Sequence, residues 1–140
     1  MECLPKVYLY RRVLNAKLFI DANFDQSIDL DIIAGEAYFS KFHFIRIFKK
    51  VYGKTPHQYL IWVRLQKAGL LLQTGLSIPN VCFAIGFESV STFTTLFKAS
   101  FATTPGTYQQ QQIARLQEMK EAPLKFIPNC FAQKNGWINK

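Results

Sequence analysis

The stretch from Ser40 to Pro56 holds side chains that could bind and read a nucleic acid. At helical spacing, one side of this stretch mixes cations with apolar residues: Lys41, Phe42, Ile45, Arg46 and Lys49. Lysine and arginine bind phosphates, arginine also pairs with a guanine edge, and apolar side chains pack on thymine methyl groups. This side therefore suits the major groove of a DNA duplex. In the alternative interpretation, Phe42 and Ile45 pack on neighbouring parts of the protein.

The opposite side of the same stretch predicts a helix that lies on a core. Its apolar residues recur at the helical interval: Phe44, Ile47, Phe48 and Val51. Ser40 offers a hydroxyl N-cap before the helix, and Gly53 predicts its end.

A second copy of the pattern follows later in the chain. Its residues repeat the order and spacing of Ser40, Phe44, Phe48, Lys49, Thr55 and Pro56, and they are Ser89, Phe93, Phe97, Lys98, Thr104 and Pro105. The chain is therefore predicted to contain two helix-turn-helix units. In the second unit, the outward side of the helix is expected to hold Val90, Ser91, Thr94, Thr95 and Lys98.

Further helices must position these two sides. A helix over 9–22 is predicted after a loose start, and the residues expected to turn inward are Tyr10, Val13, Leu14 and Leu18. Thr55 and Pro56 predict the start of a connector helix that runs to about Thr74, which would be roughly 28 Å long. Successive major grooves on one side of a duplex lie roughly 34 Å apart, so a rigid connector could present both outward sides to one face of DNA.

Other signals complete the order of elements. Asp29 is expected to cap the second helix, and Ser77 begins the second unit. Gly86 is expected to adopt a positive φ in the turn that follows. A last helix from Pro105 can continue to Glu121, and the apolar tail 123–140 is expected to dock on its own domain or on a partner.

Composition limits the class of protein. The 140 residues have a formal net charge of +8, and their number allows one compact domain or two small ones that share a core. No Asp or Glu occurs between Ala37 and Phe87, whereas Lys and Arg recur there, so the segment would attract polyanions.

The cysteines and the N-terminus predict a compartment. Cys3, Cys82 and Cys130 are far apart and show no metal-binding spacing, and Cys82 is expected to be a buried thiol. The start of the chain does not resemble a signal peptide, and no apolar run is long enough to span a bilayer. The expectation is a cytoplasmic protein with no membrane partner.

The chain resembles the AraC/XylS family of bacterial transcription regulators. Three segments, which together cover about residues 10–109, are similar to the family pattern. The first is Leu30-x-x-Ile33-Ala34, followed by the helix from Ser40 and by Gly53-x-Thr55-Pro56-x-x-Tyr59. The second is Arg64-Leu65-x-x-Ala68-x-x-Leu71-Leu72, and the third is Ile78-x-x-Val81 with Gly86-Phe87-Glu88-Ser89, Phe93, Phe97-Lys98, Pro105 and Tyr108. The resemblance implies an all-α fold of about seven helices, in which two helix-turn-helix subdomains (1–54 and 76–109) are joined by a long connector helix (55–75) and followed by a C-terminal extension (110–140).

The resemblance also implies a site and a function. The matching positions for base contacts are Phe42, Ile45 and Arg46 in the first helix and Ser91, Thr94 and Thr95 in the second. Lys41, Lys49 and Lys98 would approach phosphates, and Ser40 and Val90 complete the expected DNA-binding set. The implied function is that of a stand-alone, monomeric regulator that reads adjacent major grooves of double-stranded DNA on the nucleoid, without a cofactor or metal, with RNA polymerase as a second candidate partner.

The sequence departs from the family pattern at several positions. Tyr38 stands where the family often has a small residue, and Phe101 stands where a glycine is common. Thr95 stands where several members have arginine, and Gln109 follows Tyr108 where the family has an arginine. The second unit is therefore expected to read bases more weakly than the first.

Two other function classes are weighed against DNA binding. An enzyme is not expected, because neither His43 nor His57 has a Cys or carboxylate at a catalytic spacing, and no glycine-rich phosphate loop occurs. A protein-interaction module on the same fold, with little sequence-specific DNA binding, remains the alternative. The outward Lys and Arg residues discriminate between them, since a protein adaptor would not need them.

Overall fold

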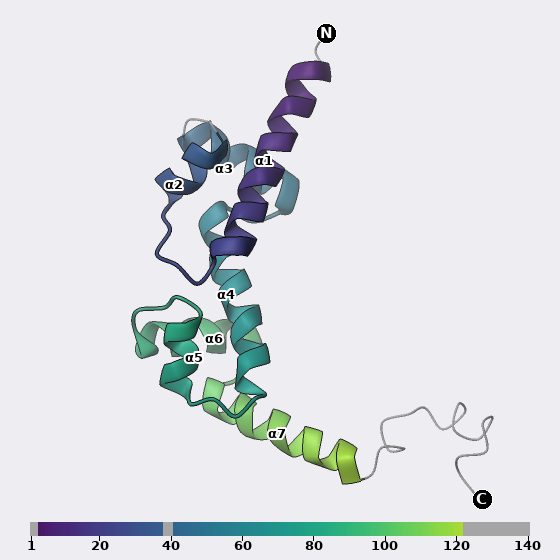
Figure 1. Cartoon of the computed structure of the whole chain (residues 1–140), viewed down its shortest axis with the longest axis vertical. Coiled ribbons are helices and arrows are strands. Elements are labelled where there is room, and N and C mark those ends of the chain that lie inside the picture. Colours follow the sequence, from purple (N-terminus) through teal and green to yellow (C-terminus); the bar gives the residue numbers. More distant parts are fainter. Residues whose placement is uncertain (1–2, 38–40, 122–140) are drawn as a thin grey trace, which may run out of the picture.

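Seven α-helices make up the part of the chain that the computed structural model describes, residues 3–37 and 41–121. They are α1 (Cys3–Asn23), α2 (Leu30–Ala37), α3 (Lys41–Tyr52), α4 (Pro56–Leu72), α5 (Ile78–Ala84), α6 (Val90–Phe101) and α7 (Pro105–Glu121). Figure 1 shows α1–α3 around one end of α4 and α5–α7 around the other end. We call α1–α3 the first unit and α5–α7 the second unit. The all-α fold predicted from the sequence is confirmed.

The buried side chains form two clusters, one in each unit. The first cluster consists of Val13, Ala16, Ile20, Ile33, Ala34, Phe44, Phe48, Tyr59, Leu60 and Val63. The second consists of Leu65, Ala68, Leu72, Val81, Cys82, Ile85, Phe87, Phe93 and Phe97. Helix α4 contributes to both clusters, and the ring of Phe24 packs against both. One helix and one loop residue therefore link the two cores.

The predicted helix starts are confirmed by their caps. The hydroxyl of Thr55 accepts a hydrogen bond from the backbone N–H of Gln58 (3.2 Å), and the Gln58 amide oxygen accepts one from the N–H of Thr55 (3.0 Å). This capping box begins α4, with Pro56 in its first turn. The hydroxyls of Ser77 and Ser89 cap α5 and α6 by accepting hydrogen bonds from the backbone N–H groups of Asn80 and Thr92.

The two units also share their aromatic packing, which explains one departure from the family pattern. Where α4 packs on the first unit, the ring centroid of Tyr59 lies 5.7 Å from that of Phe48 and 6.1 Å from that of Tyr52. In the second unit, Tyr108 lies 5.4 Å from Phe97 and 5.3 Å from Phe101. Phe101 therefore takes the place that Tyr52 has in the first unit.

The prediction for the first helix was partly wrong. Helix α1 begins at Cys3, although residues 1 to about 8 were expected to be loose. Its buried side is formed by Val13, Ala16 and Ile20, whereas three residues expected to face inward are exposed: Tyr10 (38%), Leu14 (45%) and Leu18 (50%). The helix has two apolar sides, and the side with the small Ala16 allows the closer approach to its neighbours.

Smaller differences occur at helix ends. Val51 in the last turn of α3 is 40% exposed, although it was placed in the buried stripe. The connector helix α4 ends at Leu72, two residues earlier than expected, and its 17 residues span roughly 25 Å. Gly86 has a φ of +94°, as the turn was predicted to require.

Some expectations lie outside the described residues: the cap at Ser40, the turn at Tyr38 and the docking of the tail 123–140. Among the residues that are described, no helix has both the length and the apolarity needed to cross a membrane.

Candidate nucleic-acid interface

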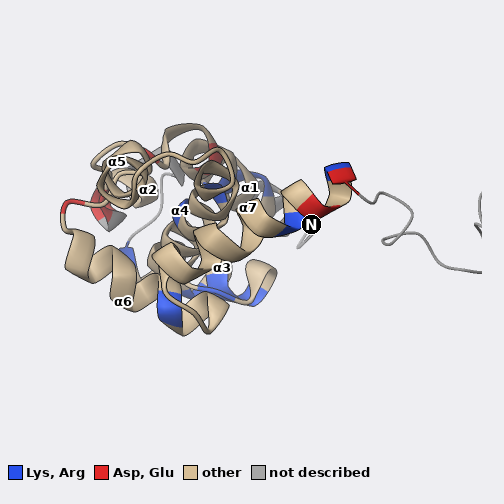
Figure 2. Ribbon diagram, turned by 90° about the horizontal axis from the view of Figure 1, so that it is seen from below, with Lys and Arg blue, Asp and Glu red and all other residues tan. Residues whose placement is uncertain are grey.

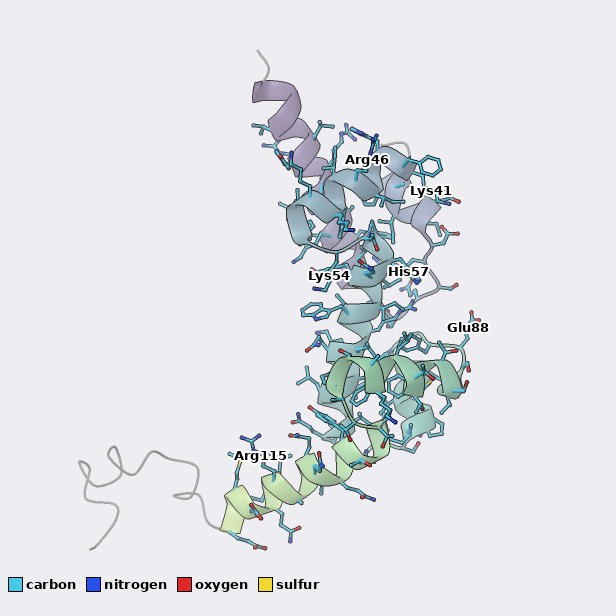
Figure 3. The ribbon with its side chains drawn as sticks, turned by 180° about the vertical axis from the view of Figure 1, so that it is seen from behind. Lys41, Arg46, Lys54, His57, Glu88 and Arg115 are labelled. Atoms are coloured by element: carbon cyan, nitrogen blue, oxygen red, sulfur yellow. The ribbon has the colours of Figure 1, made fainter. Side chains whose placement is uncertain are left out.

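Helices α3 and α6 lie on the same side of the molecule. In Figure 1 both lie behind α4, and Figure 3, the opposite view, shows both toward the viewer. Seen from below in Figure 2, they form the lower side, while α1, α2 and α5 lie on the upper side. In Figure 3 their N-terminal ends, near the labels Lys41 and Glu88, also point the same way. One straight polymer could therefore contact both helices.

The outward side of α3 combines an exposed aromatic ring with exposed cations. Phe42 is 77% exposed, the largest exposed fraction among the large hydrophobic residues described. Arg46, Lys41 and Lys49 are exposed, and Ile45 is half-buried. With 77% exposure, Phe42 does not lie in the interior of this part of the chain, whereas the half-buried Ile45 also suits the alternative in which it packs on neighbouring protein. A ring held in water next to an arginine suits contact with bases.

The inward side of α3 holds this arrangement in place. Phe44 and Phe48 are fully buried, and their ring centroids lie 5.5 Å apart at an edge-to-face angle of 63°. Gly53 ends the helix with a φ of +75°. Since the buried phenylalanines fix the rotation of the helix about its axis, they also fix the direction in which Phe42 and Arg46 point.

The outward side of α6 is less charged and less open. Ser91, Thr95 and Lys98 are exposed, and Thr94 is half-buried. The Thr95 hydroxyl donates a hydrogen bond to the Ser91 carbonyl of its own helix (3.0 Å), which leaves it mainly as an acceptor. Val90 was predicted to face outward, but it is half-buried against the second cluster because its apolar side chain gains by leaving water.

This side of the molecule holds cations and few acidic residues. Figure 2 shows Lys and Arg in blue on α3 and on part of α6 at the lower side, and also on α1 and α7, while red acidic segments lie toward the upper side and the end of α7. Lys41 lies 3.5 Å from the Asp31 carboxylate, but both side chains are exposed, so the pair is weak and a phosphate could replace the carboxylate. The field therefore favours a polyanion on the α3 and α6 side.

Hydrogen-bonded side chains from α1 and α4 hold the first unit together. The Tyr59 hydroxyl donates to the Asp21 carboxylate (2.7 Å), which also pairs with the Lys17 ammonium (2.9 Å). Burial, together with this hydrogen bond, raises the pKa of Tyr59 to about 12. The group joins α1 to α4, and the contact between the rings of Tyr59 and Phe48 extends it to α3.

One important residue was missed. Arg64 was counted with the cations that attract a polyanion, but it is only 8% exposed and donates to two backbone carbonyls. Its burial lowers the pKa of its guanidinium. The signal was its position, since Leu60 and Ala68, one turn before and one turn after it, are both buried core residues.

Comparisons with known proteins agree with this geometry. Residues 33–111 match the family model described as a helix-turn-helix domain. The chain is 38% identical over 103 residues to the Transposon Tn10 TetD protein of Escherichia coli. The matched region covers 73% of this chain and 75% of the TetD protein. It is also 35% identical over 94 residues to the right origin-binding protein of E. coli K12, of which it spans only 32%.

Two solved structures are similar over most of the described part. The DNA-binding domain of AdpA, in complex with a target DNA, has a TM-score of 0.71 at 27% identity and covers 74% of this chain and 94% of that one. A transcriptional regulator of Chromobacterium violaceum with an AraC-type DNA-binding domain has a TM-score of 0.68 at 30% identity, and the match covers 74% of this chain and 93% of that one. The chain belongs to the AraC-type helix-turn-helix family of DNA-binding transcription regulators.

Proposed function

We propose that one copy of this chain binds one face of double-stranded DNA and reads two adjacent major grooves, with α3 as the stronger recognition helix and α6 as the weaker one. The observation that supports this most is the exposure of Phe42 and Arg46 on α3, on the same side of the molecule as α6. A duplex along this side would meet both helices and their cations.

In this proposal the side chains of α3 have separate tasks. Arg46 pairs with a guanine edge, while Phe42 and Ile45 pack on thymine methyl groups. Lys41 and Lys49 bind phosphates, as does the hydroxyl of Ser40, which lies outside the described residues. The cations set the affinity for any duplex, and the three base-reading residues set the preference for a sequence.

The second recognition helix contributes less to sequence preference. Its exposed residues are hydroxyl side chains, which hydrogen-bond to several bases, and Lys98, which is placed to meet a phosphate. Val90 supports the helix from its half-buried position. We therefore expect the first half-site to carry most of the sequence information.

The family suggests a cellular setting for this activity. We propose that the chain acts in the cytoplasm on the nucleoid, as a regulator rather than as an enzyme, with RNA polymerase as a second partner. We also propose that 1–54 and 76–109 act as two DNA-binding subdomains joined by 55–75, and that 110–140 is an extension. Similar proteins include transcriptional regulators and a DNA-binding domain in complex with its target DNA, so an adaptor without DNA binding is not favoured.

Selection of bound sequences from a random duplex pool tests the proposed function. The chain should enrich a site with two parts, centred about one helical turn apart, with stronger sequence preference in one part. Lys120→Ala, which removes an exposed cation at the end of α7, should enrich the same site. Recovery of unchanged random sequence would refute sequence reading, and equal preference in both parts would refute the dominance of α3.

A further inference from the structure

Arg64 lies where three segments of the chain meet. It belongs to α4, and its Nε donates to the carbonyl of Phe24 at 2.6 Å, while its Nη2 donates to the carbonyl of Gln26 at 2.8 Å. Both carbonyls lie in the loop between α1 and α2, so the side chain ties the first unit to the connector. With 8% exposure, the guanidinium replaces most of its water contacts with these bonds.

The same guanidinium also contacts the second unit. Its Cζ lies 5.6 Å from the ring centroid of Phe87, which is 7% exposed. The ring of Phe87 in turn lies 5.6 Å from the ring of Phe93, a fully buried residue of α6. The face of an aromatic ring attracts a cation. Arg64 is therefore connected to the second recognition helix through Phe87 and Phe93.

The turn at Gly86 brings the two units into direct contact. A Cβ at this position would lie 3.0 Å from the Phe24 carbonyl oxygen and 3.1 Å from Nη2 of Arg64. The backbone there has a φ of +94°, which L side chains rarely adopt. The loop of the first unit thus lies against the turn of the second, with the Arg64 side chain between them and the connector.

A buried arginine is not the residue that stability alone would favour. An apolar side chain of similar volume often stabilises a core as well as or better than a buried charge does. Only a planar guanidinium, however, can donate to two carbonyls and lie on a ring at the same time. This combination fixes a geometry, which is what two recognition helices on one duplex need.

We propose that Arg64 is a positioning residue for DNA binding, which holds the second recognition helix at one orientation relative to the first. The inference rests on the proposed function. When two binding modules are joined rigidly at the matching distance, binding of the second becomes intramolecular at a high effective concentration. A flexible connection between the two units lowers the effective concentration at the correct half-site spacing, but it allows binding at other half-site spacings.

The first test compares duplexes with altered half-sites. The variants are Arg64→Lys, which keeps the charge but cannot make both bonds, and Arg64→Met. Each is titrated against the selected site, against a site with only the α3 half, and against sites whose halves lie one base pair closer together or further apart. Both variants should lose about tenfold or more on the full site, change less than about twofold on the half-site, and show a weaker dependence on spacing. Lys120→Met, the control for loss of one positive charge, should behave as the wild type.

The second test measures the orientation without DNA. Spin labels are attached at Lys50→Cys on α3 and Ala99→Cys on α6, both exposed, in a chain with Cys3→Ser and Cys130→Ser and with the buried Cys82 retained. The wild-type chain should give one narrow distance distribution, and both Arg64 variants should give a broader one. Circular dichroism shows whether the helices are retained.

The outcomes separate this inference from the proposed function. If the wild type selects no site, the proposed function fails, and the label distances alone decide whether Arg64 sets the orientation. If Arg64→Lys keeps a narrow distribution and the wild-type dependence on spacing, the positioning role is refuted. Loss of helical signal in both variants would also refute it, because Arg64 would then be required for folding rather than for positioning.

Discussion

Arg46 and Lys49 lie one turn apart on α3, but their proposed tasks differ. If Arg46 pairs with one base as proposed, Arg46→Ala should weaken binding to the selected site by about 1–3 kcal/mol and relax the preference at one base pair. Titration of the selected site and of its single-base variants measures this. An equal loss on the selected site and on random duplex would contradict base reading by Arg46.

Lys49 should act on every sequence alike. Lys49→Ala removes one phosphate contact and the counterion release that accompanies it. Affinity should fall by a similar factor on selected and random duplexes, and the slope of log K against log salt should become shallower by about 1. The measurement is a salt titration with both duplexes, and an unchanged slope would show that Lys49 does not contact a phosphate.

Tyr59 gives the fold a dependence on alkaline pH. Its pKa is raised to about 12 in the folded chain from the ordinary value of 10.0, so the folded state binds the phenolic proton more tightly than the unfolded state does. The stability that this provides is fully present below pH 10 and is lost as the pH rises toward 12. Urea unfolding across this range should show a steeper fall for the wild type than for Tyr59→Phe.

The same variant gives a second result at neutral pH. Tyr59→Phe removes the hydrogen bond to the Asp21 carboxylate and should lower the free energy of unfolding by roughly 1–2 kcal/mol. The Lys17 ammonium stays paired with that carboxylate, which limits the cost. Parallel pH profiles for the two proteins would mean that Tyr59 does not cause the alkaline loss.

For single residues, the sequence predicted the exposed side of α3 but not the contacts of Arg64. The period of α3 placed Phe42 and Arg46 outward because Phe44 and Phe48 had to lie inward. The position of Arg64 between Leu60 and Ala68 indicated burial, but the sequence could not show what it binds, because the acceptors are backbone carbonyls of a distant loop. The sequence also did not show that the second cluster reaches Val90 in the first turn of α6.

Among the elements, the ends of the two recognition helices invite a direct comparison. Gly53 ends α3 with a φ of +75°, and Ala102 ends α6 with a φ of +62°. The left-handed region costs an alanine roughly 1–2 kcal/mol, whereas glycine enters it readily. Ala102→Gly should therefore stabilise the chain by roughly 0.5–1 kcal/mol, because the gain exceeds the extra freedom of glycine in the unfolded chain.

The reverse change provides the matched control for this comparison. Gly53→Ala should destabilise the chain by a similar amount, since nothing lies within 4 Å of a Cβ there and only the backbone conformation opposes it. Thermal unfolding of both variants measures the two effects. A fall in melting temperature for Ala102→Gly would show that the left-handed conformation at this residue is not the source of strain.

Element boundaries followed the capping residues, whereas helix orientation did not always follow the apolar pattern. Thr55, Ser77 and Ser89 each cap the helix that they were predicted to begin, because the local hydrogen bond needs only a neighbouring N–H. Helix α1 was oriented wrongly because both of its sides are apolar, and only the packing against α2, α3 and α4 selects between them.

For the whole molecule, the internal repeat was the most informative pattern. Two similar units on one connector predict two similar surfaces, and the structure places α3 and α6 on one side of α4. The repeat could not predict what fixes the angle between the units. That depends on the Phe24 ring, the Arg64 bonds and the close approach at Gly86, which involve residues far apart in the chain.

In the proposed complex, one chain contacts two adjacent major grooves on one face of a duplex. Guanine N7 methylation protection on the selected site, at one chain per duplex, reports major-groove contacts directly. We expect two protected segments on the same face, centred about 10 base pairs apart, with the stronger protection in the half bound by α3. A single protected segment, or two segments on opposite faces, would contradict it.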